Sequence, residues 1–267
     1  MTGAALREPA RLFDVAGKVA IVTGASGAFG RACAIALGAL GAKLLLASGD
    51  RAGAEAVAQE VRAVGGAVAV VARRPDSAED AALILGAALE AHGRADILVV
   101  ASGMNKVARI ESLAEGDWQG VMDANVRGAW LMAKALGPYF VANRVRGKVV
   151  FLSSVRGRLG NAYGYSAYCT AKGATDALTR VLATEWGPHG ICVNAIAPTV
   201  FRSKLTAWMF GDDDAAKAAR ARSVSRTPLG RLGEPEDLIG MLIYLVSRAS
   251  DFCTGQVMYV DGGYTAA

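Results

Sequence analysis

Tyr168 and Lys172 are the two residues whose types and spacing most suggest chemistry in this chain. Residues four apart share one face of an α-helix, so the ammonium group of Lys172 can lie beside the phenol of Tyr168. A neighbouring positive charge favours the phenolate and would move the phenol pKa from about 10 toward neutrality. Such a tyrosine can donate and accept a proton. Taken alone, such a pair on a helix is usually an ordinary surface pair.

The composition predicts a globular enzyme. The chain has 267 residues, of which 53% are hydrophobic, and this is enough for a large buried core. No apolar run approaches the roughly 20 residues of a membrane span, and the segment Met1 to Pro9 contains no apolar signal core. We therefore expect a cytoplasmic location and no membrane partner.

Charge and ligand-forming residues disfavour nucleic-acid and metal sites. The net charge is +5, but Lys and Arg are scattered among acidic residues, whereas nucleic-acid-binding proteins concentrate them on one face. The thiol and imidazole side chains are Cys33, Cys169, Cys192, Cys253, His92 and His189. They show neither metal-ligand spacing nor a pairing pattern. We expect free thiols, no metal site and no histidine-based triad.

Strand-like apolar runs alternate with helix-like runs along the chain. The predicted strands are Val19–Thr23, Lys43–Ala47, Ala67–Val71, Ile97–Val100, Lys148–Leu152, Cys192–Ile196 and Val257–Val260. The predicted helices are Ala28–Leu40, Gly53–Val64, Ala78–His92, Trp118–Val141, Ala162–Trp186 and Glu236–Ser247. Near-continuous apolar strands are typical of parallel sheets buried on both faces. The pattern predicts an α/β fold with a Rossmann-type doubly wound sheet of about seven strands and helices on both faces.

One segment departs from this alternation. No Pro- or Ser-rich linker divides the chain, so we expect residues 1–267 to form one domain. The segment Ser203–Thr227 is polar and irregular, with three successive aspartates followed by three arginines. Long insertions of this kind commonly form lids over active sites. A solvated helical hairpin explains the same composition equally well.

A glycine-rich turn follows the first predicted strand. After Thr23 the chain continues Gly24-Ala25-Ser26-Gly27-Ala28-Phe29-Gly30 into a predicted helix. Glycines at such a turn let the backbone approach a pyrophosphate, whose charge is met by the helix N-terminus. The alternative is a tight strand-to-helix turn without a ligand. The position in the first βαβ unit favours a dinucleotide site.

Together these motifs resemble the short-chain dehydrogenase/reductase family. The matching residues are Thr23-Gly24-x-x-x-Ala28-x-Gly30, Asn125, Ser154, Tyr168-x-x-x-Lys172 and Val260-Asp261-Gly262-Gly263. The likeness extends from about Leu12 to the C-terminus. The segments from Ser154 to Tyr168 and from Ala197 to Ser203 look closest to gluconate 5-dehydrogenase-like members.

The resemblance implies hydride transfer between a nicotinamide and a secondary alcohol or ketone, such as a polyol or sugar acid. It implies that Tyr168 moves the proton and that Lys172 lowers its pKa and binds the nicotinamide ribose. Ser154 would donate a hydrogen bond to the substrate oxygen, and Asn125 would hold a water that links Lys172 to solvent. The implied cofactor-binding residues are Gly24, Ser26, Phe29, Gly30, Ser48, Asp50, Arg51, Ala101, Ser102, Gly103, Tyr168, Lys172, Pro198, Phe201 and Ser203.

The chain departs from the family pattern around the cofactor. This chain has Ala28 where the family has the second glycine of the turn, and Val100-Ala101-Ser102-Gly103 where it has Asn-Asn-Ala-Gly. It also has Arg73-Arg74 about where the family has an Asp that contacts the adenine, and Thr199 where the family has Gly. The missing asparagines are expected to remove side-chain amides that tie neighbouring strands together. The cofactor site is therefore less orthodox than the catalytic one.

Cofactor preference is set at the end of the second strand. An acidic residue there binds the 2′-hydroxyl of NAD, and an arginine accommodates the 2′-phosphate of NADP. Ser48 occupies the usual acidic position and Gly49 the usual arginine position. Positive charge could come from Arg51, Arg73 or Arg74, whereas Asp50 could bind a free ribose. We favour NADP(H), with NAD(H) as the alternative.

The sequence does not identify the substrate. Residues that could line the pocket are Met104, Arg156, Arg158, Asn161, Trp208 and Met209. Arginines there would suit a carboxylate or polyol, but they could equally be solvated loop residues.

A non-catalytic dinucleotide-sensing or scaffold protein on the same fold is the rival hypothesis. The family resemblance implies a homotetramer or homodimer, to which the Leu238–Val246 helix and the last strand could contribute an interface.

Overall fold

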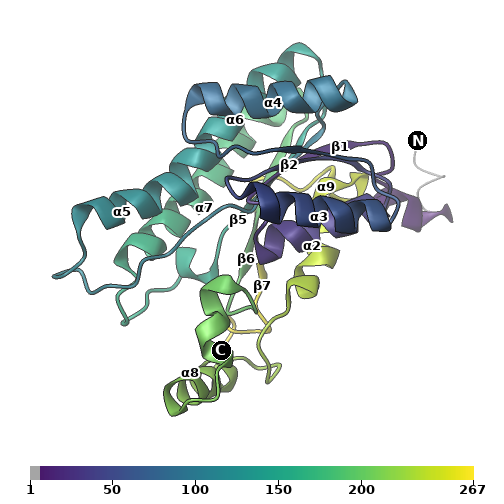
Figure 1. The fold of residues 1–267 in the computed structure, drawn as a ribbon. Coiled ribbons are helices and arrows are strands. Elements are labelled where there is room, and N and C mark those ends of the chain that lie inside the picture. The colour runs from purple at the N-terminus through teal and green to yellow at the C-terminus, as the bar shows by residue number, and fades with distance from the viewer. Residues whose placement is uncertain (1–6) are drawn as a thin grey trace.

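Seven parallel strands form one sheet at the centre of the molecule (Figure 1). The computed structural model describes residues 7–267, except for the side chains of Lys204 and Leu205. The strands are β1 (Val19–Thr23), β2 (Lys43–Ala47), β3 (Val68–Val71), β4 (Ile97–Val100), β5 (Lys148–Leu152), β6 (Cys192–Pro198) and β7 (Val257–Val260). Their order is β3-β2-β1-β4-β5-β6-β7, and all neighbours are parallel. The predicted doubly wound sheet is confirmed.

The apolar runs form strands because the sheet is covered on both faces. Every residue of β1, β4, β5 and β6 is buried, whereas the edge strands β3 and β7 are only partly buried. Five predicted strands have the observed bounds. The third begins one residue later, at Val68, and the sixth continues to Pro198, which lies opposite Val260 of β7.

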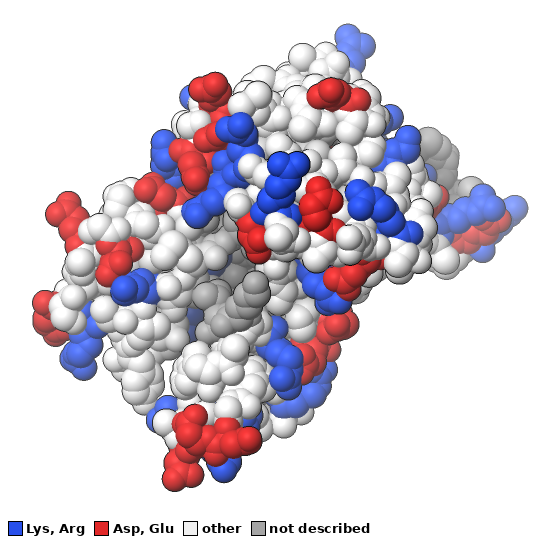
Figure 2. Space-filling view, in the orientation of Figure 1, with Lys and Arg blue, Asp and Glu red and all other residues white. Residues whose placement is uncertain are grey.

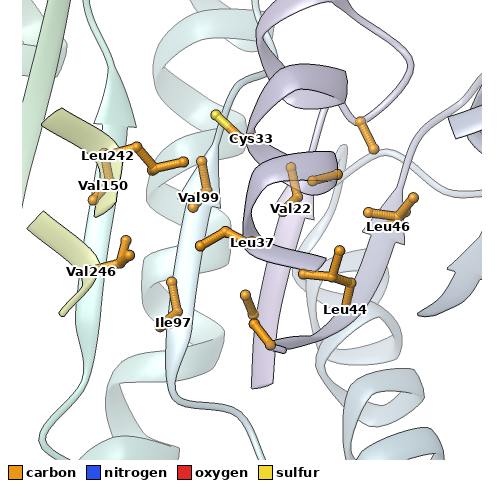
Figure 3. Close-up of a cluster of buried hydrophobic side chains, with 14 of the residues drawn as sticks. Val22, Cys33, Leu37, Leu44, Leu46, Ile97, Val99, Val150, Leu242 and Val246 are labelled. Carbon is orange, nitrogen blue, oxygen red and sulfur yellow. The ribbon is translucent and has the colours of Figure 1, made fainter. Parts of the chain in front are cut away.

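Helices cover the two faces of the sheet and complete two cores. One face carries α2 (Ala28–Ala39), α3 (Arg51–Ala63) and α9 (Ile239–Val246), and the other carries α4 (Ala78–His92), α6 (Gly128–Ala142) and α7 (Ser166–Trp186). Successive residues along a strand pack alternately into one core and into the other. In Figure 3, Val22 and Val99 point toward Leu37 of α2 and Leu242 of α9, whereas Ile21 and Leu98 belong to the opposite core.

The long helix predicted over Trp118–Val141 is interrupted by a wider turn. The observed segments are α5 (Glu115–Met122), the π-helical turn η2 (Asp123–Arg127) and α6. A π-helical turn adds a residue to an α-helix and occurs mostly at functional sites. Apolar periodicity could not reveal it, because the chain remains helical on both sides. Asn125 lies in this turn and is 3% exposed.

Three other predicted helices have different starts. α7 begins at Ser166 instead of Ala162, because Gly164 adopts a left-handed φ of 80°. α3 begins at Arg51, where the Asp50 side chain caps it. The helix predicted from Glu236 consists of the 3-10 turn η6 (Pro235–Leu238) followed by α9. The remaining short 3-10 turns are η1 (Pro9–Phe13), η3 (Val155–Gly157), η4 (Gly187–His189) and η7 (Arg248–Ser250).

The segment from residue 203 to 227 is helical. It contains the 3-10 helix η5 (Lys204–Phe210) and α8 (Asp214–Ser225), at the end of the molecule where Figure 1 marks the C-terminus. Asp213 Oδ1 accepts a hydrogen bond from the Ala216 nitrogen at 2.8 Å, and Arg220 Nη1 donates to the Met209 carbonyl at 2.7 Å. These helices agree with the helical hairpin that the sequence left as an alternative; the segment looked irregular because an alanine-rich, charged helix has little apolar periodicity.

Two structural features are absent from the described residues, 7–267. No helix among them is long and apolar enough to cross a membrane. Nor do three or more His, Cys, Asp or Glu side chains gather there in a group that could hold a metal ion. Lys and Arg side chains are interspersed with Asp and Glu over the face shown in Figure 2, in agreement with the scattered charges of the sequence.

Candidate active site

The winding of the sheet reverses between β1 and β4. β1 lies between β2 and β4, so the chain proceeds outward from β1 toward one edge and from β4 toward the other. Ligands of open α/β sheets bind at such a point, outside the carboxyl ends of the strands. The glycine turn and the loop after β4 meet here, where the Ala101 nitrogen donates to the Thr23 carbonyl at 3.1 Å.

The glycine turn has no room for side chains at two positions. Gly24 has a φ of 68°, and a Cβ atom there would lie 2.5 Å from the Ser102 nitrogen. At Gly30 a Cβ atom would lie 2.3 Å from the Gly24 carbonyl oxygen. No side chain caps α2 at Gly27, so backbone N–H groups of its first turn can receive an anion. The turn therefore fits the diphosphate of a dinucleotide.

A pair of hydroxyl groups connects the two loops. Thr23 Oγ1 and Ser102 Oγ are 3.4 Å apart. They lie where the sequence lacks the amide side chains of the family pattern. The altered Ala101-Ser102-Gly103 sequence therefore does not leave the loops without a side-chain connection.

Ser154 and Tyr168 meet beyond the carboxyl end of β5. Ser154 is 6% exposed, donates to the Pro198 carbonyl at 3.4 Å and accepts from the Arg156 nitrogen at 3.2 Å. Its hydroxyl lies near the phenol of Tyr168, in the first turn of α7, and opposes the rise in the phenol pKa that burial causes. Tyr168 and Met104 pack against the same small apolar cluster. Met104 is thus the predicted pocket residue on the apolar side of the phenol.

Lys172 lies one turn further along α7. Its Nζ atom donates to the Leu152 carbonyl at 2.7 Å and lies 5.5 Å from the centroid of the Tyr168 ring. The residue is only 4% exposed. The spacing of four therefore brings the two side chains together, with the ammonium group beside the ring and bonded to the end of β5.

Asn125 brings a third element to Lys172. Its Nδ2 atom donates to the carbonyls of Met104 and Val121, at 2.7 and 2.8 Å. Its Oδ1 atom is buried and accepts no hydrogen bond from the described residues. A Cβ atom on Gly103 would lie 2.7 Å from this oxygen and 3.6 Å from Lys172 Nζ. Gly103 is therefore the spacer between them.

Burial shifts the pKa values of Tyr168 and Lys172 in opposite directions. It raises the pKa of Tyr168 to about 12, against the effect of the nearby Ser154 hydroxyl. It lowers the pKa of Lys172 to about 8, against the charge of Asp176. The expectation that the neighbouring charge of Lys172 moves the tyrosine pKa toward neutrality was wrong, because the loss of water around the phenol outweighs its polar contacts.

Ser153 and Asp176 are site residues that the sequence did not single out. Ser153 Oγ donates to Asp176 Oδ1, and burial raises the pKa of this carboxyl group. Asp176 follows Lys172 by one helical turn, and its charge raises the lysine pKa. The continued spacing of four, from 168 through 172 to 176, was the available signal.

Arginine and tyrosine side chains from the segment after Ser154, from α8 and from the C-terminal segment contact one another. Arg156 Nη2 donates to the Tyr264 hydroxyl at 3.2 Å, and its guanidinium lies 6.0 Å from the Tyr165 ring centroid. From α8 and the residue after it, Arg222 lies over Tyr163 at 5.4 Å and Arg226 lies over Tyr264 at 4.5 Å.

The other predicted pocket residues lie apart from the phenol. Arg158 lies 5.9 Å from the Tyr259 ring centroid, and Asn161 Oδ1 accepts a hydrogen bond from the Tyr163 nitrogen. Trp208 is 58% exposed, whereas Met209 is buried. The structure therefore connects Met104 and Arg156 most directly with Ser154 and Tyr168.

The predicted cofactor residues after β2 form a small polar network. Ser26 Oγ lies 2.9 Å from Ser48 Oγ, which also accepts a hydrogen bond from the Asp50 nitrogen. Asp50 Oδ1 accepts from the Gly53 nitrogen at 2.9 Å. The carboxylate therefore caps α3, and the exposed Arg51 is the first residue of that helix.

The predicted residues after β6 contact both the glycine turn and the hairpin of η5 and α8. Phe201 packs edge-on against Phe29, with centroids 5.6 Å apart. Pro198 supplies the carbonyl that Ser154 binds. Ser203 exchanges hydrogen bonds with Thr206 at the start of η5. One connection thus links the turn, Ser154 and the hairpin.

Known proteins share this arrangement over nearly the whole chain. A family model described as enoyl-(acyl carrier protein) reductase matches residues 24–265. An uncharacterised oxidoreductase of Mycobacterium tuberculosis is 54% identical over 255 residues, which cover 95% of this chain and 93% of the relative. The gluconate 5-dehydrogenase of Gluconobacter oxydans is 35% identical over 257 residues, which cover 96% of this chain and 98% of the relative.

A solved structure also matches nearly the whole chain. The gluconate 5-dehydrogenase of Burkholderia cenocepacia, in complex with NADP and tartrate, has a TM-score of 0.89 and 29% identity, and the match covers 96% of this chain and 98% of that one. The likeness thus includes the half of the sheet that carries Ser154 and Tyr168 as well as the glycine turn. This chain belongs to the short-chain dehydrogenase/reductase family and is an NAD(P)-dependent oxidoreductase acting on alcohol and ketone groups.

Proposed function

We propose that this protein interconverts a secondary alcohol and a ketone of a sugar acid or polyol, with Tyr168 as the acid–base residue. The observation that carries the proposal is the convergence of Ser154 and Lys172 on Tyr168: the Ser154 hydroxyl lies near the phenol and affects its pKa, and the Lys172 ammonium group lies 5.5 Å from the ring centroid. A bound nicotinamide would supply or accept the hydride. The residues of this chain bind, orient and move the proton.

Tyr168 would move the proton at the substrate oxygen. In oxidation the phenolate takes the hydroxyl proton, and in reduction the phenol returns a proton to the oxygen. Ser154 would donate a hydrogen bond to the same oxygen and stabilise the charge that develops there. Burial holds the phenol pKa near 12, so loss of this proton depends on the positive charge of Lys172 beside the ring.

Lys172 and Asn125 would connect this proton to solvent. A pKa of about 8 lets Lys172 release and regain a proton close to neutral pH. The buried Oδ1 atom of Asn125 faces the same space across Gly103. A water held between this oxygen and Lys172 Nζ would satisfy both groups.

The surroundings of Arg156 favour an anionic or hydroxyl-rich substrate. A guanidinium positioned by Tyr264 near Ser154 suits the carboxylate of a sugar acid, and the Tyr264 hydroxyl suits a polyol. Two relatives are gluconate 5-dehydrogenases by name, and the structure of one contains tartrate, a hydroxy acid. These observations favour a sugar acid over a hydrophobic ketone.

The segment from residue 203 to 227 would act as a lid within a single domain. It follows the Phe201 connection that reaches both the glycine turn and Ser154. Arg222 from α8 lies over Tyr163, five residues before Tyr168. A helical hairpin joined to the site by side-chain contacts of this kind can move as a unit to cover a substrate.

Replacement of Tyr168 by Phe tests the proposed function. We expect kcat with NADPH or NADH, over a panel of sugar acids, polyols and ketones, to fall by about 10²- to 10⁴-fold because the proton donor is lost. Dinucleotide binding, followed by fluorescence titration, should remain within about threefold of wild type. Turnover near the wild-type rate would refute the role of Tyr168.

Tyr165→Phe is the matched control. Its ring lies edge-on to Tyr168 at 6.3 Å, but residue 169 is Cys, so no lysine lies four residues further on. We expect kcat to stay within about threefold of wild type. Dinucleotide binding by the wild type without turnover across the whole panel would favour the rival hypothesis of a non-catalytic sensor.

Location and assembly extend the proposal. We expect the protein in the cytoplasm, where cell fractionation would find it with other cytoplasmic enzymes. We also expect a homotetramer or homodimer.

A further inference from the structure

Gly49 and Arg74 occupy the ends of neighbouring strands and are in direct contact. Gly49 follows β2 and Arg74 follows β3, and these strands pair in parallel from Leu44–Val68 to Ala47–Val71. The Arg74 stem lies over Gly49: a Cβ atom on the glycine would be 2.8 Å from Arg74 Cδ and 2.9 Å from Cγ. Arg74 thus fills the space that a side chain at position 49 would need.

We propose that Arg74 binds the 2′-phosphate of NADP(H), from the connection after β3 and through the space left by Gly49. This inference rests on the proposed function, because it concerns the adenosine end of the same cofactor. In this arrangement two departures from the family pattern compensate each other. The arginine expected at position 49 is absent, and an arginine stands near the place where an aspartate is usual, with its stem on position 49.

The acidic residues near the end of β2 do not favour a free ribose. Ser48 stands at the usual acidic position, and its hydroxyl is engaged by Ser26 and by the Asp50 nitrogen. Asp50 accepts from the Gly53 nitrogen and caps α3. A carboxylate that accepts hydrogen bonds from both hydroxyls of a ribose is therefore replaced here by a serine.

Arg74 is better placed for a ligand than its neighbour Arg73. Arg73 Nη1 donates to Asp80 Oδ1 at 2.5 Å, in the first turn of α4. Arg74 Nε lies 3.5 Å from Asp76 Oδ1, and both side chains are more than half exposed, so this pair contributes little. The terminal nitrogens of Arg74 form no hydrogen bond with the described residues. A planar guanidinium can bind two oxygens of a phosphate at once.

The test uses fragments of the cofactor that cannot react. Isothermal titration calorimetry would measure 2′,5′-ADP, which carries the 2′-phosphate, and 5′-AMP, which lacks it, with the full-length wild type and Arg74→Ala. We expect the variant to bind 2′,5′-ADP at least about tenfold more weakly, because a charge-assisted contact is lost. Binding of 5′-AMP should change by less than about twofold.

Two further single variants separate Arg74 from the other arginines. Arg73→Ala removes the same charge one residue away and should change the ratio of the two affinities by less than about twofold. Arg51→Ala tests the arginine that begins α3. A larger loss of 2′,5′-ADP affinity in Arg51→Ala than in Arg74→Ala would overturn the proposal. So would an equal loss of both ligands in Arg74→Ala, or a wild type that binds both equally.

An exchange variant provides a rescue. In Gly49→Arg/Arg74→Ala the new side chain occupies the space that the old one leaves, and we expect 2′,5′-ADP affinity within about fivefold of wild type. A folded exchange variant that binds no better than Arg74→Ala would contradict the inference. Since these measurements need no turnover, failure here is distinct from failure of the Tyr168→Phe test.

Discussion

The two residues at the centre of the site are displaced in pKa by a common cause. Tyr168 and Lys172 both lose water on folding, and each is thereby held in its neutral form over a wider pH range: the pKa rises to about 12 for the phenol and falls to about 8 for the ammonium. The two side chains therefore do not carry opposite charges in the interior at the same pH. A charged ligand bound beside these side chains would shift both pKa values.

The lowered pKa of Lys172 predicts a pH-dependent stability. Below pH 8 the lysine is protonated in both the folded and the unfolded chain, and the cost of burying its charge is present in full. Between pH 8 and 10.5 the unfolded chain keeps a proton that the folded protein has lost, so stability rises with pH. We expect the free energy of unfolding of wild type, relative to Lys172→Met, to increase by up to about 3 kcal/mol across this interval.

Urea denaturation of both proteins between pH 7 and 10.5 would measure this difference. The raised pKa of Tyr168 acts with the opposite sign, but only near pH 10 and above, where the tyrosine of the unfolded chain ionises, so the lower part of the interval reports on Lys172. A difference that stays constant with pH would show that burial does not lower the pKa of Lys172.

At the scale of the element, the glycine turn is limited by backbone contacts. Gly30→Ala would place a methyl group 2.3 Å from the Gly24 carbonyl oxygen and 2.8 Å from the Ala25 Cα atom. Neither atom can move without changing the turn. We expect a loss of about 1–3 kcal/mol in the free energy of unfolding, together with weaker binding of NADPH and NADH, measured by urea denaturation and fluorescence titration.

Gly86→Ala is the control for this substitution. Gly86 lies within α4, and a Cβ atom there meets nothing within 4 Å. Alanine in a helix interior is favoured over glycine by about 0.5–1 kcal/mol, so this variant should be more stable than wild type with unchanged dinucleotide binding. Equal stability of the two variants would contradict the steric account of Gly30.

The strands were predictable because a strand that is buried on both faces is a nearly continuous run of apolar residues. Val19–Thr23 and Ile97–Val100 are continuous apolar runs and have the predicted bounds. The helix Asp214–Ser225 could be given only as one of two alternatives, because alanine and charged residues mark no continuous apolar stripe. The start of α7 depends on the backbone conformation of Gly164, which residue type alone does not fix.

The candidate site was predictable to the extent that it follows local spacing. Tyr168 and Lys172 are one helical turn apart, and Ser154 follows a strand, so their meeting could be inferred from the resemblance and the fold. The contact of Arg74 with Gly49 depends on the pairing of β2 and β3. The hydrogen bond from Ser153 to Asp176 likewise joins two elements. Contacts of this kind require the tertiary structure.

At the scale of the whole molecule, the β7 edge of the sheet is less covered than its centre. All four residues of β7 are partly exposed, and Met241, Ile243 and Tyr244 on α9 are also partly exposed. Phe252, between these elements, is fully exposed. Apolar surface gathered at a sheet edge favours association with another copy of the chain, in agreement with the predicted contribution of α9 and the last strand.

Light scattering after size-exclusion chromatography would measure the assembly. We expect wild type at two or four times the monomer mass, and Phe252→Glu at a smaller multiple because it places a charge in the interface. Leu83→Glu is the control: Leu83 is 46% exposed on α4, outside the β7 edge, and the variant should keep the wild-type mass. A monomeric wild type would refute the prediction.

The π-helical turn between α5 and α6 has a consequence for comparisons among relatives. Each residue of an α-helix advances the chain by about 100° around the axis, so the added residue of η2 sets the direction in which Asn125 faces. A relative shortened by one residue between 123 and 127 would keep both helices and an asparagine, yet turn its amide away from Lys172. Single-residue gaps in this segment therefore carry more functional information than most substitutions along the same helix.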